Sequence, residues 1–177
     1  MALRVIAGKY RRRLLQSLPG EATRPMLDSL RETLFNVLQN RVAGKVFVDL
    51  YAGTGAVGIE ALSRGASRTV FVEENPKACA LIYENLRTVG AESEAQVIQS
   101  PVGKALPRVE GDLFFLGPPY ALAEEYENTL RALGETPPEL VVAQHAKTHT
   151  LADAYGGLRR FRLLRQGSNS LSFYESA

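Results

Sequence analysis

Short apolar runs alternate with stretches of helical periodicity along most of this chain. Five runs hold few polar residues and predict strands: 45–50, 69–73, 95–99, 113–116 and 140–143. Three stretches between them space their apolar residues along one face of a helix: 56–64, 76–89 and 124–133. Apolar strands separated by helices are typical of a parallel sheet that is covered on both faces. The pattern therefore predicts a doubly wound, mostly parallel α/β fold.

The two ends of the chain follow a different pattern. Residues 3–7 and 13–17 are short strand-like runs that predict an antiparallel hairpin, and a loop rich in proline and glycine follows them. Residues 28–42 have helical periodicity. Near the C-terminus, residues 161–165 and 170–174 predict a second hairpin that closes the sheet.

The composition fits a single folded domain. With 177 residues, 45% of them hydrophobic, the chain is long enough for one core. Its one cysteine, Cys79, excludes an internal disulfide and a cysteine-based metal cluster. No apolar run has membrane-spanning length, and basic residues interrupt the N-terminus where a signal peptide would be apolar. We therefore expect a cytoplasmic protein that does not contact a membrane.

The positive charge is concentrated in the N-terminal part. Residues 1–41 contain eight lysines and arginines against three acids, so they carry +5, while the whole chain carries only +2. We divide the chain accordingly into a basic hairpin and loop, 1–27, and a folded domain, 28–177. A basic segment on a mildly acidic domain favours contact with phosphates, although a solvated basic hairpin would have the same composition.

A glycine-rich turn follows the first strand of the predicted sheet. Residues 53–58 read Gly-Thr-Gly-Ala-Val-Gly, a spacing that lets the backbone approach a ligand closely, so a dinucleotide-dependent oxidoreductase is one interpretation. Asp49, four residues earlier, favours a cationic ligand, because its carboxylate would repel a pyrophosphate. Glu73 ends the next strand, where a carboxylate can accept both hydroxyls of a ribose. An ordinary surface acid, like its neighbour Glu74, is the simpler alternative.

A second motif, Gly-Pro-Pro-Tyr at residues 117–120, follows the predicted strand 113–116. Two prolines fix the backbone and remove two N–H donors, so neighbouring carbonyls can face a ligand. Carbonyl acceptors suit a planar amino group, and Tyr120 suits a stacked base. A proline-rich turn with Tyr120 packed in the core is the structural alternative.

Two histidines, His145 and His149, lie four residues apart after the last strand of the predicted parallel set. Helical spacing of this kind can bind a metal, but no third ligand accompanies them. Structural histidines are commoner than three-ligand sites, so we predict no metal.

These segments resemble a family of bacterial methyltransferases that modify a guanine amino group in small-subunit ribosomal RNA. The resemblance is carried by residues 4–9, 23–25, 31–36, 49–55, 58–66, 71–73, 118–120 and 170–174. It implies the Rossmann-like class I methyltransferase fold, with a seven-stranded sheet whose last hairpin places one strand antiparallel. It also implies S-adenosylmethionine as methyl donor, with S-adenosylhomocysteine as product. The implied partner is ribosomal RNA or an assembling small ribosomal subunit, and we expect the protein to be a monomer.

The resemblance also assigns roles to residues. The implied cofactor-binding residues are Asp49, Tyr51, Gly53, Thr54, Gly55, Glu73, Glu74, Gln99 and Ser100. The implied catalytic segment, which would frame the target base, is Gly117, Pro118, Pro119 and Tyr120. The implied RNA-binding residues are Arg11, Arg12, Arg13 and Arg24. We expect the hairpin and loop that carry these arginines to lie beside the catalytic segment and to position an unstacked guanine.

The sequence departs from the family pattern in two places. Gly117 stands where the family has an aspartate that orients the target amino group, and loss of such a partner costs about 10²–10³ in rate. Gln99 and Ser100 stand where an aspartate contacts the adenine amine. A weak or inactive member that binds cofactor or RNA is therefore the main alternative. A DNA amino-methyltransferase is disfavoured because no target-recognition insert is present, and an oxidoreductase because a second substrate domain is absent.

Overall fold

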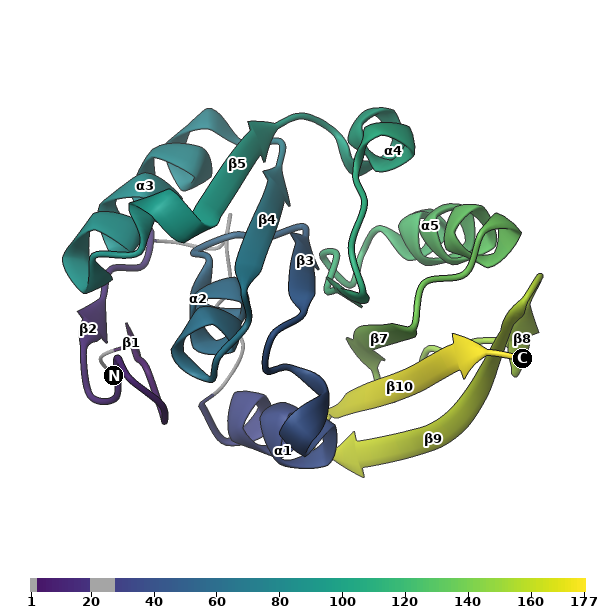
Figure 1. Cartoon of the computed structure of the whole chain (residues 1–177). Coiled ribbons are helices and arrows are strands. Elements are labelled where there is room, and N and C mark those ends of the chain that lie inside the picture. Colours follow the sequence, from purple (N-terminus) through teal and green to yellow (C-terminus); the bar gives the residue numbers. More distant parts are fainter. Residues whose placement is uncertain (1–2, 20–27) are drawn as a thin grey trace.

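One mixed sheet forms the centre of the molecule (Figure 1). The computed structural model describes residues 3–19 and 28–177. Within this part of the chain the sheet has eight strands: β3 (Val46–Leu50), β4 (Arg68–Glu73), β5 (Ala95–Gln99), β6 (Leu113–Leu116), β7 (Leu140–Ala146), β8 (Ala154–Tyr155), β9 (Leu158–Gln166) and β10 (Asn169–Ser176).

The strands lie in the order β5-β4-β3-β6-β7-β10-β9-β8. Those from β3 to β7 run parallel, while β10, β9 and β8 are antiparallel to their neighbours. The chain moves from β3 outward through β4 and β5, and then returns to β6 on the other side of β3. This reversal between β3 and β6 is a topological switch point, and in open α/β sheets ligands bind at such points beyond the carboxyl ends of the strands.

The sheet differs from the sequence prediction at its far edge. We predicted seven strands; the additional strand β8 has two residues, pairs with β9, and is too short to produce a hydrophobic pattern. Strand β7 also extends three residues beyond its predicted end, because β10 pairs with it as far as Asn169 and Ala146. His145 therefore lies within a strand, not after it.

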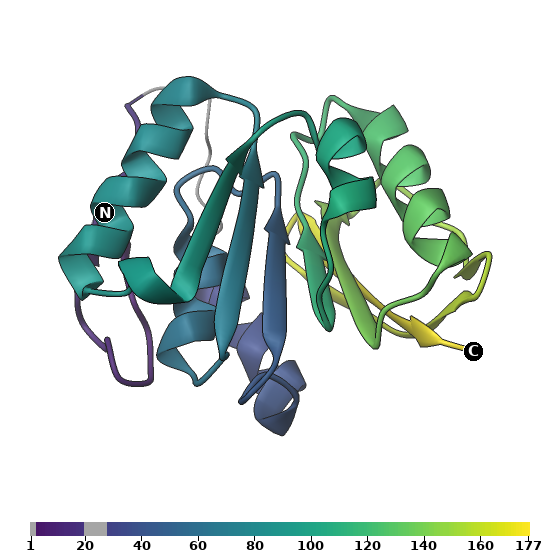
Figure 2. The same ribbon diagram turned by 45° about the horizontal axis from the view of Figure 1, so that its top comes forward.

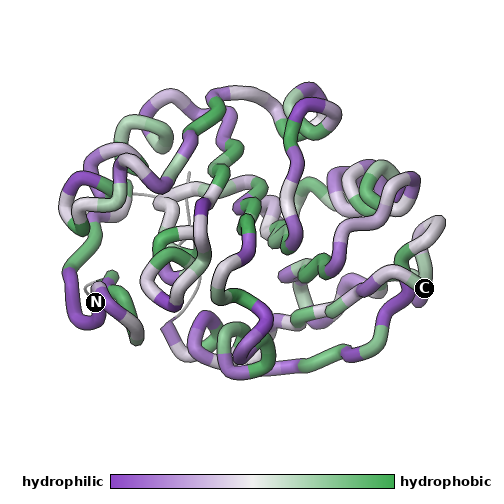
Figure 3. The backbone as a smooth tube through the Cα atoms, viewed as in Figure 1, coloured by the Kyte–Doolittle hydropathy of each residue, from purple (hydrophilic) through white to green (hydrophobic). Residues whose placement is uncertain are grey.

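Helices cover both faces of the sheet (Figure 2). One face carries α1 (Asp28–Leu38), α2 (Ala56–Ser63) and α3 (Pro76–Val89), and the other carries α4 (Val102–Ala105) and α5 (Ala123–Glu135). Helix α1 ends four residues earlier than predicted and continues as a 3-10 turn, Gln39–Arg41. Hydrophobic residues follow the central strands, whereas the helices alternate between hydrophobic and polar residues (Figure 3). The predicted doubly wound architecture is confirmed.

Among the helices that the structure describes, none combines the length and the apolar character needed to cross a membrane.

The N-terminal arm, residues 3–19, packs against the helices of one face. Strands β1 (Leu3–Arg4) and β2 (Leu14–Leu15) pair antiparallel, so the predicted hairpin is confirmed, with shorter strands than expected. Leu3, Val5 and Leu15 are buried in the same cluster as side chains of α1, α2 and α3. The arm thus shares the core of the domain, and the boundary at residue 27 stays a prediction.

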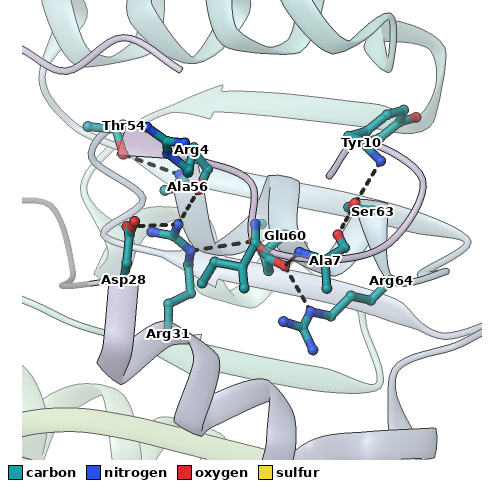
Figure 4. A network of polar contacts seen from close by, with 12 residues as sticks. Arg4, Ala7, Tyr10, Asp28, Arg31, Thr54, Ala56, Glu60, Ser63 and Arg64 are labelled. Atoms are coloured by element: carbon teal, nitrogen blue, oxygen red, sulfur yellow. Dashed lines mark hydrogen bonds and ion pairs between the residues drawn. The ribbon is translucent and has the colours of Figure 1, made fainter. Parts of the chain in front are cut away.

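A buried carboxylate fastens the arm to α2 (Figure 4). Glu60 is 0% exposed and accepts hydrogen bonds from the backbone N–H groups of Ile6, at 2.9 Å, and Ala7, at 3.0 Å. The guanidinium of Arg64 donates to it at 2.8 Å, and Nε of the equally buried Arg31 lies 3.5 Å away. Two cations and two amides therefore meet one carboxylate.

Candidate active site at the carboxyl ends of the strands

The strand register brings the predicted site residues to one edge of the sheet. Asp49 lies near the end of β3, Glu73 ends β4, Gln99 ends β5, and Gly117 directly follows β6. Glu73 and Gln99 are register partners, and Ser100 donates its N–H to the Glu73 carbonyl at 3.0 Å. The prediction that these strand ends lie at one edge of the sheet is therefore confirmed.

The turn between β3 and α2 depends on glycine. Gly53 has φ 58° and Gly55 has φ 81°, both in the left-handed region that glycine adopts without strain. A Cβ at Gly55 would also lie 3.3 Å from the Ile82 side chain. Tyr51 adopts φ 60° as well, and its hydroxyl is held by Thr129 at 2.7 Å and Glu125 at 3.1 Å, both in α5. The turn thereby points the N-terminus of α2 at the switch point.

Glu73 connects this turn to the start of α3. One carboxylate oxygen accepts the N–H of Gly53 and the other accepts the N–H of Asn75, both at 2.8 Å. The side chain is half-buried, and each oxygen keeps a lone pair for a further donor. Glu73 can therefore accept the two hydroxyls of a ribose, whereas Glu74 beside it is exposed.

Replacing Glu73 by glutamine is expected to weaken binding of S-adenosylhomocysteine by roughly 10- to 100-fold. The amide keeps only one acceptor oxygen, so one of the two ribose hydroxyls would lose its acceptor, and a hydrogen bond to a charged group contributes about 1.5–3 kcal/mol. Isothermal titration calorimetry measures the change. Glu92→Gln, the same substitution at an exposed acid in the turn before β5, is the control and should bind as the parent does. Equal affinities of both variants would contradict the expectation that Glu73 binds the ribose.

Asp49 lies beneath the first turns of α2. Its side chain is 1% exposed and accepts the N–H of Gly58 at 3.0 Å. Burial raises the pKa of the Asp49 carboxyl well above its usual range, and the neighbouring charge of Glu73 raises it further. Asp49 thus anchors the helix whose N-terminus faces the site. A cationic group beside it would favour its charged form.

Asn85 is a residue of this region that the sequence analysis missed. It is fully buried in α3 and donates Nδ2 to the carbonyls of Thr54, at 2.9 Å, and Gln16, at 3.0 Å. Its Oδ1 accepts the N–H of Gln16 at 2.8 Å. Asn85 therefore joins the arm to the glycine turn. The available signal was a polar residue on the apolar face of the helix, beside Leu86.

The Pro-Pro-Tyr segment is held by contacts of its own. The Pro119 carbonyl accepts the N–H of Leu122 at 2.9 Å. The Tyr126 hydroxyl lies 3.4 Å from the Pro118 carbonyl but donates its hydrogen to the Gln144 carbonyl at 2.7 Å. The Pro119 carbonyl therefore already takes part in a hydrogen bond within the protein. Tyr120 is 38% exposed, so it is not a core residue, and its hydroxyl donates to Asn169.

The basic turn of the arm lies away from this edge. Arg13 donates to the Thr88 carbonyl at the end of α3, and Lys9 pairs with Glu94 at 3.5 Å, just before β5 begins. Helix α3 has 14 residues and is thus about 20 Å long, which separates the turn from the carboxyl ends of the strands. For the hairpin, the expectation that it lies beside residues 117–120 is wrong, because its turn packs against the ends of α2 and α3. The loop, 20–27, which carries Arg24, lies outside the described residues, so that part of the expectation stays a prediction.

His145 is a structural residue. Its Nδ1 lies 2.8 Å from the His149 carbonyl, so this nitrogen carries the proton and Nε2 accepts the Ser172 hydroxyl at 2.8 Å. Burial lowers the pKa of the imidazole. Within residues 3–19 and 28–177, no group of three or more histidine, cysteine or acidic side chains could hold a metal ion.

The strand order, the antiparallel β10 and the glycine turn at the switch point define a class I methyltransferase fold. The solved structure of Escherichia coli yhhF, named as a candidate methyltransferase, has a TM-score of 0.84, 27% identity, and covers 99% of this chain and 98% of its own. An RNA methyltransferase from Salinibacter ruber, solved with S-adenosylhomocysteine, has a TM-score of 0.69 and covers 86% of this chain and 94% of its own. With 16% identity it shows the fold alone.

The sequence comparisons identify the family. The chain belongs to the family described as Conserved hypothetical protein 95, which matches residues 3–175. YlbH of Bacillus subtilis, named as a candidate rRNA methyltransferase, is 33% identical over 98% of both chains. Ribosomal RNA small subunit methyltransferase D of Escherichia coli is 34% identical over 75% of this chain and 68% of its own.

Proposed function

We propose that this protein is an S-adenosylmethionine-dependent methyltransferase that modifies a guanine exocyclic amino group in small-subunit ribosomal RNA. The main support is that β6 leads into Gly-Pro-Pro-Tyr, residues 117–120, at the same switch point as the glycine turn. The names of the relatives from Bacillus subtilis and Escherichia coli support the RNA substrate.

The residues along the edge fit the proposed cofactor. Glu73 would hold the ribose, with Glu74 beside it, and Gln99 and Ser100 would meet the adenine. The methionine end would lie against the glycine turn and Asp49: Asp49, Tyr51, Gly53, Thr54 and Gly55. The bound donor supplies an electrophilic methyl group, and the task of the protein is to hold the target nitrogen in line with it.

The target base would stack on Tyr120. A guanine amino group is a weak nucleophile because its lone pair is shared with the ring, so its orientation matters more than for an aliphatic amine. The base must leave its stack to reach this edge, which favours a loop or an incompletely folded part of the RNA. A naked RNA and an assembling small subunit both offer such a site.

The exposed side chains of Arg11 and Arg12 would bind RNA phosphates about 20 Å from the reacting base. Arg13 shares this turn, but it already donates to the Thr88 carbonyl. Arg24 is proposed as a further contact from the sequence alone. The RNA footprint would then span one side of the domain, along α3.

Removing Arg11 and Arg12 together by alanine substitution is expected to weaken RNA binding and to reduce the slope of log K against log salt by roughly one for each lost contact. Turnover at saturating RNA should stay close to the parent, because the turn does not reach the catalytic edge. Fluorescence anisotropy across a salt series measures the slope. Arg131→Ala, an exposed arginine of α5, is the control. An unchanged slope in the double variant would refute the phosphate contacts.

The direct test is transfer of labelled methyl from S-adenosylmethionine to small ribosomal subunits, or to assembly intermediates, that lack the modification. Incorporation at a guanine amino group, located by mass spectrometry, is the expected result. No incorporation by the parent chain or by Gly117→Asp would overturn the proposal.

A binding-only member of the family is the second candidate, and Gly117 is the observation that favours it. A glycine there removes the carboxylate that the family resemblance implies. Cofactor binding without transfer, combined with transfer by Gly117→Asp, would support this alternative.

A further inference from the structure

The side chain missing at Gly117 has a neighbour in the next strand. Leu116 of β6 and Ala143 of β7 are register partners, so Gly117 and Gln144 follow them side by side. Side chains on adjacent parallel strands point to the same face, about 5 Å apart. A Cβ built on Gly117 would lie 3.4 Å from Oε1 of Gln144 and 3.3 Å from the Phe115 ring. Gln144 thus reaches the space that a longer residue at position 117 would fill.

The hydrogen bonds of Tyr120 decide which way the Gln144 amide faces. The Tyr120 hydroxyl donates its hydrogen to Asn169 Oδ1, so its oxygen is the acceptor for a second partner. Nε2 of Gln144 donates to that oxygen at 3.1 Å. The amide nitrogen is therefore directed at Tyr120, and the carbonyl oxygen Oε1 faces residue 117. A half-buried side chain held at one end presents a fixed acceptor at the other.

We propose that Gln144 is a catalytic residue whose Oε1 accepts a hydrogen bond from the target amino group. This inference rests on the proposed function and names the acceptor that Gly117 lacks. The acceptor would then come from β7, and not from the Gly-Pro-Pro-Tyr segment that follows β6. Gln144 lies beside Tyr120, whose ring we propose to stack on the base.

The chemistry is consistent with a neutral acceptor. In methyl transfer, the nitrogen lone pair forms the new N–C bond while the electrons of the S–C bond stay on sulfur. The nitrogen then releases one proton to water, since an amide oxygen is too weak a base to keep it. Gln144 would orient the nitrogen without taking the proton. A neutral acceptor is weaker than a carboxylate, so turnover should be lower than with an anion at this place.

The test compares turnover of Gln144→Leu, Gln144→Glu and the parent chain on ribosomal particles. Leucine has similar size but no acceptor, and its kcat should fall about 10²-fold with the affinity for S-adenosylhomocysteine unchanged. Glutamate keeps an oxygen and should retain turnover. Gln96→Leu, a glutamine of β5 that bonds Arg68, is the matched control and should behave as the parent.

Two further variants separate this role from a structural one. Tyr120→Phe removes the hydroxyl that anchors Nε2 but leaves Oε1, so its loss of kcat should be much smaller than that of Gln144→Leu. Adding Gly117→Asp to Gln144→Ala should restore turnover, because the aspartate then has free space and replaces the acceptor.

Each outcome decides the matter. Loss in Gln144→Leu with rescue by the aspartate supports the inference. If the parent chain is active and Gln144→Leu is equally active, the inference is overturned and the proposed function stays intact. An inactive parent that Gly117→Asp activates also overturns it, since Gln144 then fails to replace the carboxylate. No methyl transfer by the parent chain or by any variant overturns the proposed function, and the inference with it.

Discussion

Replacing Glu60 by glutamine is expected to lower the free energy of unfolding by about 3–5 kcal/mol, the usual cost of breaking a buried ion pair from one side. The carboxylate has no exposed surface and meets Arg31, Arg64 and the N–H groups of Ile6 and Ala7. An amide is uncharged and offers one acceptor oxygen, so the buried Arg31 guanidinium keeps only its ion pair with Asp28, at 3.1 Å, and a backbone donor is left unpaired. For a domain of this size the melting temperature should fall by roughly 6–20 °C.

The matched control is Glu94→Gln. Glu94 pairs with Lys9 at 3.5 Å, and this pair also joins the arm to the body, but its side chains are 36% and 51% exposed. Exposed pairs contribute about 0–1 kcal/mol, so this variant should unfold close to the parent. Urea titrations of the three proteins give the comparison. A midpoint for Glu60→Gln no lower than that for Glu94→Gln would show that the buried pair does not stabilise the arm.

Substituting Gly58 by alanine is expected to destabilise the protein by about 1–3 kcal/mol. A Cβ there would lie 2.3 Å from Cε2 of Phe71 and 2.9 Å from the Thr69 methyl, and the Phe71 ring is itself fully buried. The helix must therefore move away from the sheet, and this outweighs the roughly 1 kcal/mol that alanine gains over glycine in a helix. Movement of α2 also weakens the Gly58–Asp49 hydrogen bond, so affinity for S-adenosylhomocysteine should fall.

Gly103→Ala is the control for this substitution. Gly103 is also helical, in α4, and a Cβ there meets no atom within 4 Å. Alanine should therefore leave stability unchanged or raise it by up to about 1 kcal/mol. Thermal unfolding and calorimetric titration measure both variants. Opposite signs for the two stability changes are expected; a stabilised Gly58→Ala would contradict the close helix–sheet contact.

The hydrophobic pattern predicted the central elements well. Strands β5 and β6 and helix α3 have the predicted bounds, because each is a short apolar or amphipathic run limited by turn residues. Asn75 before Pro76 is a strong start signal, and its side chain accepts the N–H of Lys77 at 2.8 Å. The length of strand β7 was underestimated, since Gln144 and His145 near its end are polar and the end is held by pairing with β10.

The candidate site was predicted in part. The sequence motifs placed Glu73, Gln99 and the segment 117–120 at strand ends, and parallel strands bring their ends to one edge. The contacts of Asn85 and Gln144 join segments that are distant in the chain: Asn85 meets Gln16, and Gln144 lies beside Gly117. A single sequence contains no signal for such pairs beyond an isolated polar residue.

The sequence by itself determined the fold class and the edge of the sheet at which we propose the site. Both follow from local periodicity and from turn residues, which act over a few positions along the chain. Only the tertiary structure decided that the arm's basic tip packs at the ends of α2 and α3, and that Gln144 faces the space beside Gly117. The reason is physical: strand register and helix packing set these distances, and they depend on contacts between residues that are far apart in the chain.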